Sequence, residues 1–175
     1  ADVTMDSAPW WRVYCDGYGG QGSLGGTSYE GATGGYLFVC PATGSEDLRL
    51  YASHEQFPVA LSMFLRRVEA EHYTTHVMFV DTHSINISEE AELVASLYGV
   101  NILPVAAGSP EEMAFVESRV RLLKRHSTAQ MLGAPRLPAS FWALSDKYAV
   151  YTRQFLPQST RNFHCSFYLR TGRVI

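Results

Sequence analysis

The spacing of hydrophobic residues changes along the chain, and this change predicts where strands give way to helices. Short runs rich in aromatic and β-branched residues are typical of strands, and three occur early, at residues 11–16, 36–40 and 48–53. Two later runs are continuously apolar, as expected for strands that are buried on both faces, at residues 76–81 and 100–105.

Between and after the later strands, apolar residues recur at the spacing of one helix face. This spacing predicts helices over residues 56–72, 88–99, 109–132 and 137–156. Ser88 suits the N-cap of the second helix, because a serine oxygen accepts from free backbone N–H groups, and Gly99 suits its end. Ser109 starts the third helix in a capping-box-like sequence, and Gly133 ends it.

The predicted order of elements is β, β, β, α, β, α, β, α, α. This order favours an α/β fold, with a mixed five-stranded sheet and helices on its faces. Nine glycines lie between Gly17 and Gly35, and they predict a long irregular loop over that stretch. Residues 163–173, "FHCSFYLRTGR", fit either a strand or a helix.

The composition predicts a single domain and excludes an overall basic charge. The 175 residues, 46% of them hydrophobic, suffice for one core, so a single domain is expected over residues 1–175. The formal net charge of −3 excludes an overall basic field, so any nucleic-acid binding must use a local basic surface. No apolar run approaches the roughly 20 residues of a membrane span, and no membrane association is expected.

Cysteine usage is compatible with a reducing intracellular compartment. Cys15, Cys40 and Cys165 are odd in number and far apart, and the sequence has no C-x-x-C pair. This pattern argues against a disulfide framework and against a cysteine-rich zinc site.

Three acidic residues lie where the predicted fold brings distant parts of the chain together. Asp16 ends the first strand, Asp81 ends the fourth, and Glu117 lies two turns into the long third helix. If the two strands are parallel neighbours, their ends lie about 5 Å apart, and a helix crossing nearby can add Glu117. Carboxylates gathered in this way repel one another and need a counter-charge, for which Mg²⁺ or Mn²⁺ suits hard oxygen ligands.

Each acid also has an ordinary structural explanation. An aspartate after a strand is commonly a turn residue, and Glu117 can pair with Arg121 one helical turn later. The three acids taken together favour a catalytic metal site over a structural role. Two ions about 4 Å apart can stabilise both the attacking and the leaving oxygen of a phosphodiester displacement.

Longer motifs surround these acids. Thirty-five residues separate Asp81 from Glu117, and "VYCDGYG" surrounds Asp16. Residues 109–132 read "SPEEMAFVESRVRLLKRHSTAQML", and residues 137–157 read "LPASFWALSDKYAVYTRQFLP". These stretches resemble the Asp, Asp, thirty-five, Glu signature and the "SPxxNGxxERxNRTLxxxARxML" and "LPxxFWxxAxxxAxYxxNRxP" patterns of retroviral-type integrases, in particular those of copia-like LTR retrotransposons. The resemblance covers about residues 10–160.

The resemblance implies an RNase H-like catalytic core that cleaves DNA and transfers DNA strands with two Mg²⁺ or Mn²⁺ ions. Asp16 and Asp81 would share one ion, and Asp16 and Glu117 would hold the second. The zinc-binding amino-terminal and basic carboxy-terminal domains of integrases are expected to be absent from these 175 residues.

The same resemblance implies partners and a location. The core would bind double-stranded DNA, and the helix containing "SFWALSDKYAVY" would support a homodimer or larger homo-oligomer. The expected location is nuclear and intracellular. The residues expected along the DNA backbone are Arg119, Arg121, Lys124 and Arg125.

Two departures from the family pattern keep alternatives open. Thr82 and His83 stand where active members usually have Asn-Gly after the second Asp, and Met113 and Ala114 replace the Asn-Gly before the Glu. These changes favour a non-catalytic DNA-binding or protein-interaction module as the alternative. A nuclease of the RNase H superfamily that cuts RNA in hybrids is the third possibility.

Overall fold

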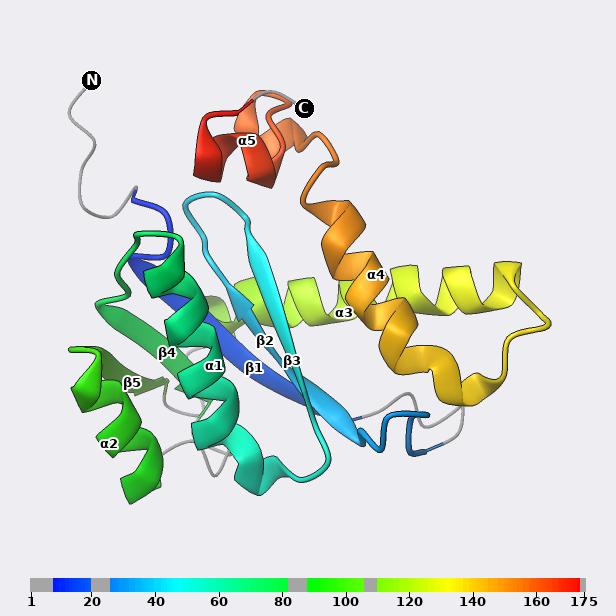
Figure 1. The fold of residues 1–175 in the computed structure, drawn as a ribbon. Helices are drawn as coiled ribbons and strands as arrows, with labels where there is room; N and C mark the ends of the chain where they lie inside the picture. Colours follow the sequence, from blue (N-terminus) through cyan, green and yellow to red (C-terminus); the bar gives the residue numbers. More distant parts are fainter. Residues whose placement is uncertain (1–7, 20–25, 82–87, 106–109, 174–175) are drawn as a thin grey trace.

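Five strands form one mixed sheet (Figure 1). The structure is a computed structural model, and it describes residues 8–19, 26–81, 88–105 and 110–173. The strands are β1 (Arg12–Gly19), β2 (Gly34–Val39), β3 (Glu46–Tyr51), β4 (Val77–Asp81) and β5 (Asn101–Val105). Their order across the sheet is β3-β2-β1-β4-β5. The first three are antiparallel neighbours, whereas β4 and β5 run parallel to β1, which confirms the predicted sheet.

The helices follow the predicted order, with shifts at their ends. They are α1 (Phe57–Ala70), α2 (Glu89–Leu97), α3 (Pro110–Gly133), α4 (Trp142–Arg153) and α5 (Ser166–Thr171). Ser88 caps α2 as predicted, since its side-chain oxygen accepts from the backbone N–H of Ala91. The helix predicted from residue 137 is shorter, because a 3₁₀ turn (Ala139–Phe141) precedes it. The ambiguous stretch at residues 163–173 contains helix α5.

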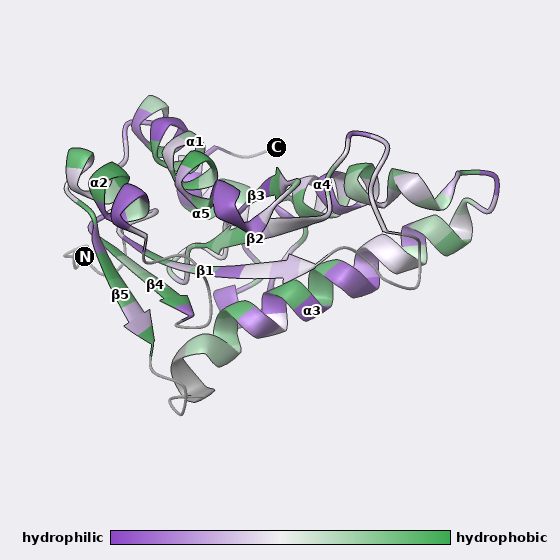
Figure 2. Cartoon of the chain, turned by 90° about the horizontal axis from the view of Figure 1, so that it is seen from below, coloured by the Kyte–Doolittle hydropathy of each residue, from purple (hydrophilic) through white to green (hydrophobic). Residues whose placement is uncertain are grey.

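Side chains alternate between the two faces along each strand and build two separate cores. On one face, Val13, Cys15 and Val80 pack with α1 and α2. On the other face, Tyr18 and Leu37 pack with α3 and α4. Figure 2 shows α3 running beside β1, with hydrophobic and hydrophilic bands alternating along the helix. The sheet thus separates α1 and α2 from α3.

The loop predicted over residues 17–35 is wrong at both ends, because β1 continues through Gly19 and β2 begins at Gly34. A Cβ atom at Gly34 would overlap the Tyr18 carbonyl oxygen and the Tyr51 hydroxyl. That hydroxyl donates a hydrogen bond of 2.9 Å to the same carbonyl. Glycine at this position therefore permits a close contact between strands rather than ending one.

Other predictions from the sequence concern the start of α3, the pair after Asp81, the cysteines and membrane spans. The helix start at Ser109 and the pair Thr82 and His83 lie outside the described residues. Cys15, Cys40 and Cys165 are free thiols, the first two of them buried. Among the described helices, none combines the length and apolarity needed to cross a bilayer.

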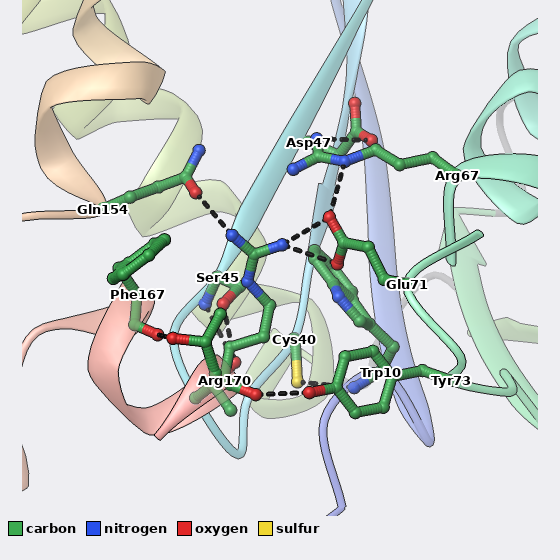
Figure 3. Close-up of polar contacts among 12 residues, drawn as sticks. Trp10, Cys40, Ser45, Asp47, Arg67, Glu71, Tyr73, Gln154, Phe167 and Arg170 are labelled. Carbon is green, nitrogen blue, oxygen red and sulfur yellow. Dashed lines mark hydrogen bonds and ion pairs between the residues drawn. The ribbon is translucent and has the colours of Figure 1, made fainter. Parts of the chain in front are cut away.

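Helix α5 docks on the rest of the domain through Arg170 (Figure 3). Its guanidinium donates to both carboxylate oxygens of Glu71, at 2.6 and 2.5 Å, and to the side-chain oxygen of Gln154 at 3.1 Å. The Tyr73 hydroxyl donates to the Arg170 carbonyl oxygen. Burial raises the pKa of Glu71, but hydrogen bonds and charge from Arg170 and Arg67 outweigh burial and hold that pKa below its usual value.

Replacing Arg170 with Met is expected to lower the free energy of unfolding by about 2 kcal/mol at neutral pH, because Glu71 would lose its closest counter-charge. The pKa of Glu71 is depressed in the folded state. Its contribution is therefore present above the unfolded pKa and disappears as the pH falls through the folded pKa. Urea denaturation measures the effect. The matched change at the exposed Arg173 should alter stability by less than about 0.5 kcal/mol, and equal losses in both variants would contradict the docking role.

Candidate active site

The parallel pairing of β1 with β4 places Asp16 and Asp81 side by side. Asp81 ends β4 as predicted, but the prediction that Asp16 ends the first strand is wrong, because β1 continues through Gly19. The two strands are parallel, and their last paired residues are Cys15 and Val80. The aspartates follow one position later on each strand, on neighbouring strands roughly 5 Å apart. Because Cys15 and Val80 belong to the core under α1, alternation turns both aspartates toward the face that α3 covers. Both side chains are half-buried.

Helix α3 carries Glu117 to this edge of the sheet. The helix contacts β1, β2 and β4. Its buried face is made by Met113, Val116, Val120 and Leu123. Glu117 follows Val116 and is turned about 100° from it around the helix axis, so it lies exposed on a flank of the packed face. Packing of the apolar stripe on the sheet is therefore what sets the position of the carboxylate.

The charge around Asp16 shows that the three acids interact. Its pKa is raised from 3.8 to about 6, first by burial and then by the negative charges of Asp81 and Glu117. A hydrogen bond from the backbone of Gly17 and the positive charge of Lys124 act in the opposite direction but do not cancel the increase. The net effect at Asp16 is thus a carboxylate that is harder to ionise because two other acids lie nearby.

The three acids interact through space without forming a compact ligand cluster. Within the described part of the chain, no three His, Cys, Asp or Glu side chains are grouped closely enough to hold an ion. The donor chemistry nevertheless fits a hard divalent cation, since all the ligands would be carboxylates. Mg²⁺ is commonly anchored by one or two carboxylates and keeps several waters, so the pair of aspartates on neighbouring strands suits it.

Tyr18, Lys124 and Asp146 border these acids, and the sequence did not single out Tyr18 or Asp146. The Tyr18 hydroxyl donates to Asp146 Oδ2 at 2.7 Å, and Asp146 is fully buried in α4. The Lys124 ammonium lies 5.4 Å from the centre of the Tyr18 ring, on the same flank of α3 as Glu117. The hydrogen bond to Asp146 therefore holds in place the tyrosine ring that the lysine contacts. Tyr18 was missed because it lies in the glycine-rich stretch predicted as a loop.

The basic residues expected along DNA lie on different flanks of α3. Lys124 lies on the Glu117 flank, near Asp16. Arg119 lies on the opposite flank, where its guanidinium is 3.6 Å from Glu46 and 5.4 Å from the centre of the Phe115 ring. Arg121 and Arg125 are exposed. The four residues thus do not form one continuous contact surface with the acids.

The departure at Met113 and Ala114 has a clear packing consequence. Met113 is 7% exposed and belongs to the core between α3 and the sheet, whereas Ala114 is exposed. Both residues also favour helix more than Asn-Gly would. The first turns of α3 are therefore stabilised by packing where the integrase pattern has a polar amide.

Comparison with known proteins relates the fold to solved structures. No protein-family model and no curated protein matches this sequence. A structure of the simian T-cell lymphotropic virus intasome in complex with PP2A regulatory subunit B56 gamma matches with a TM-score of 0.75 and 15% identity. The match covers 96% of this chain but 56% of that one, so the present chain spans little more than half its length.

Two structures of the HTLV-2 integrase catalytic core domain in complex with magnesium match over nearly their full length. The trimeric form gives a TM-score of 0.69 at 13% identity, covering 93% of this chain and 97% of that chain. The dimeric form gives 0.68 at 14% identity, with the same coverage. At such identities the likeness establishes the fold. The chain has the RNase H-like fold of integrase catalytic cores, as predicted.

Proposed function

We propose that this chain is an integrase-type polynucleotidyl transferase core that cleaves and joins DNA strands with divalent metal. The observation that carries the proposal is the raised pKa of Asp16, caused after burial by Asp81 and Glu117, where two parallel strands of an integrase-like fold lie side by side. Carboxylates that raise one another's pKa are unfavourable for folding, so their grouping at one edge favours a function.

Each acid has a distinct place in the proposed mechanism. Asp16 and Asp81 would hold one Mg²⁺ or Mn²⁺ ion, and Asp16 and Glu117 would hold the other. When bound, such ions activate a water or a DNA 3′-hydroxyl and stabilise the charge that develops on the scissile phosphate. Lys124, on the ring of Tyr18, would hold a phosphate of the same strand by its positive charge.

The proposal extends to the type of integrase, its substrate and location, and its oligomeric state. The motifs that follow Glu117 support a relation to copia-like retrotransposon integrases, and a core of this kind would act on double-stranded DNA in the nucleus. The HTLV-2 core domains that match are described in trimeric and dimeric forms. Leu144, Tyr148 and Tyr151 are exposed on α4, where a second copy of the chain would bury apolar surface.

The buried Met113 favours a second candidate function, a non-catalytic integrase-derived module that binds DNA or protein. In this alternative the acids remain, but the polar amide next to the site has been exchanged for core packing. Neighbours of metal ligands commonly change metal affinity or activity by 10- to 100-fold, so loss of activity is a realistic consequence.

A strand-nicking and strand-transfer assay with labelled duplex DNA and Mn²⁺ separates these functions. The wild-type chain is expected to cut or join DNA, and Asp81→Asn should reduce the rate by at least about a hundredfold, because a metal ligand loses its charge. Glu92→Gln, an exposed acid on α2, is the matched control and should leave the rate unchanged. Absence of Mn²⁺-dependent products from the wild type would support the non-catalytic module, and preferred cleavage of RNA in hybrids would support the nuclease.

A further inference from the structure

A basic groove lies along the outer side of α3 and extends from Arg121 to Arg119, on the flank opposite Glu117 and Lys124. It has a volume of about 910 Å³ and runs between α3 and the segment that follows α4, residues 157–161. Its lining includes four arginines, Arg119, Arg121, Arg125 and Arg161. None of the three acids of the candidate active site is among the described residues that line it.

Hydrogen bonds hold two of these arginines in place at the base of the groove. Arg161 Nη1 donates to Gln158 Oε1 at 2.6 Å, and its Nη2 donates to the Pro41 carbonyl oxygen at 2.7 Å. Arg119 Nη2 donates to the same oxygen of Gln158 at 3.5 Å. One amide oxygen therefore orients two guanidinium groups that approach from different parts of the chain.

The groove carries positive charge that its own lining does not balance. No Asp or Glu occurs among its described lining residues. Glu46, buried behind it, is shared between Arg119 and Arg153, at 3.6 and 2.7 Å. Burial and the nearby charge of Arg119 lower the pKa of Arg161. In a chain with a net charge of −3, this local excess favours an anionic ligand.

We propose that the groove binds the phosphodiester backbone of a nucleic-acid segment other than the one held at the acids. Planar guanidinium groups match phosphate oxygens, and Ser159 and Thr160, whose hydroxyls can act as neutral donors, line the same groove. Arg121 and Arg125 are exposed one turn apart, about 6 Å along the helix, so the two guanidinium groups can contact different phosphates of one strand. The choice of nucleic acid as ligand rests on the proposed function.

The test measures binding of fluorescein-labelled duplex DNA by anisotropy in EDTA, so that metal at the acids cannot contribute. Arg125→Ala is expected to weaken binding about fivefold and to reduce the dependence of log affinity on log salt by about one. Arg66→Ala is the matched control, because it removes the same charge from an exposed position on α1, across the sheet. It should change the affinity less than twofold. Thermal melts of both variants check that the fold is intact.

The outcomes distinguish this groove from the candidate active site. Equal affinities for Arg125→Ala and Arg66→Ala would overturn the proposal, as would competition by polyglutamate as effective as competition by unlabelled DNA. Asp81→Asn should bind DNA normally in EDTA. A chain without strand-cutting activity whose DNA binding still depends on Arg125 would refute the proposed catalysis and leave the groove standing.

Discussion

Replacing Asp16 with Asn is expected to stabilise the metal-free protein at neutral pH. The pKa of Asp16 is raised from 3.8 to about 6 in the folded state, by burial and by the charges of Asp81 and Glu117. A shift of this size corresponds to about 3 kcal/mol of destabilisation at pH 7 as an upper limit. Part of it is lost in practice, because the half-buried side chain stays in contact with water. We expect a gain of roughly 1–3 kcal/mol in the free energy of unfolding.

The direction of the pH dependence follows from the raised pKa. The folded state binds the Asp16 proton more tightly than the unfolded state does. The stability from this proton is therefore fully present below about pH 3.8 and is lost as the pH rises through about 6. The difference between wild type and Asp16→Asn should accordingly shrink as the pH falls from 7 toward 4. Chemical denaturation in EDTA at several pH values measures this difference.

The control for Asp16→Asn is a neutralised acid away from the site. Glu92→Gln, exposed on α2, should leave the stability within about 0.5 kcal/mol at every pH. If Asp16→Asn were no more stable than the wild type at pH 7, or if its advantage grew on acidification, the carboxylates would not be repelling one another.

Replacing Arg153 with Met is expected to lower the free energy of unfolding by about 3 kcal/mol or more. Arg153 Nη2 lies 2.7 Å from Glu46 Oε1, and the two side chains are 6% and 2% exposed. Burial raises the pKa of Glu46, whereas the charges of Arg153 and Arg119 lower it. Without Arg153, Arg119 at 3.6 Å would be the one cation still paired with the buried carboxylate among the residues that the structure describes. Removing one partner of a buried pair leaves a charge that is poorly compensated.

A second substitution tests this reasoning. Adding Glu46→Gln to the Arg153→Met variant should recover part of the lost stability, because the uncompensated charge is removed. The matched control is Arg136→Met, at an exposed position, with an expected change below about 0.5 kcal/mol. Urea denaturation of the four proteins completes the comparison. A loss below about 1 kcal/mol in Arg153→Met, or a further loss in the double variant, would show that the pair is not important for stability.

The sheet and its helices could be predicted because each element has a strong local pattern. The apolar run at residues 76–81 and the helical spacing from residue 56 leave few alternatives, and the serine cap at Ser88 forms as expected. Glycine content misled the prediction over residues 17–35. Gly34 serves a close contact with Tyr18 and Tyr51, and such a contact becomes visible only when the strands are paired.

The site was only partly predictable. Asp16, Asp81 and Glu117 could be proposed because the assumption that their strands are parallel neighbours is correct, although Asp16 lies inside β1 and not at its end as predicted. The hydrogen bond from Tyr18 to Asp146 joins residues 128 positions apart, and no local pattern indicates it. The division of the basic residues between two flanks of α3 also depends on which helix face packs on the sheet.

A calorimetric titration of Mn²⁺ into the wild-type chain and the Asp16→Asn variant determines whether the carboxylates form a metal site. Asp16 is the acid that both proposed ions would share. We expect saturable binding heat in the wild type and none above dilution in the variant, under conditions where both proteins are folded. Equal heats in the two proteins, or no heat in either, would contradict a metal site built on these carboxylates.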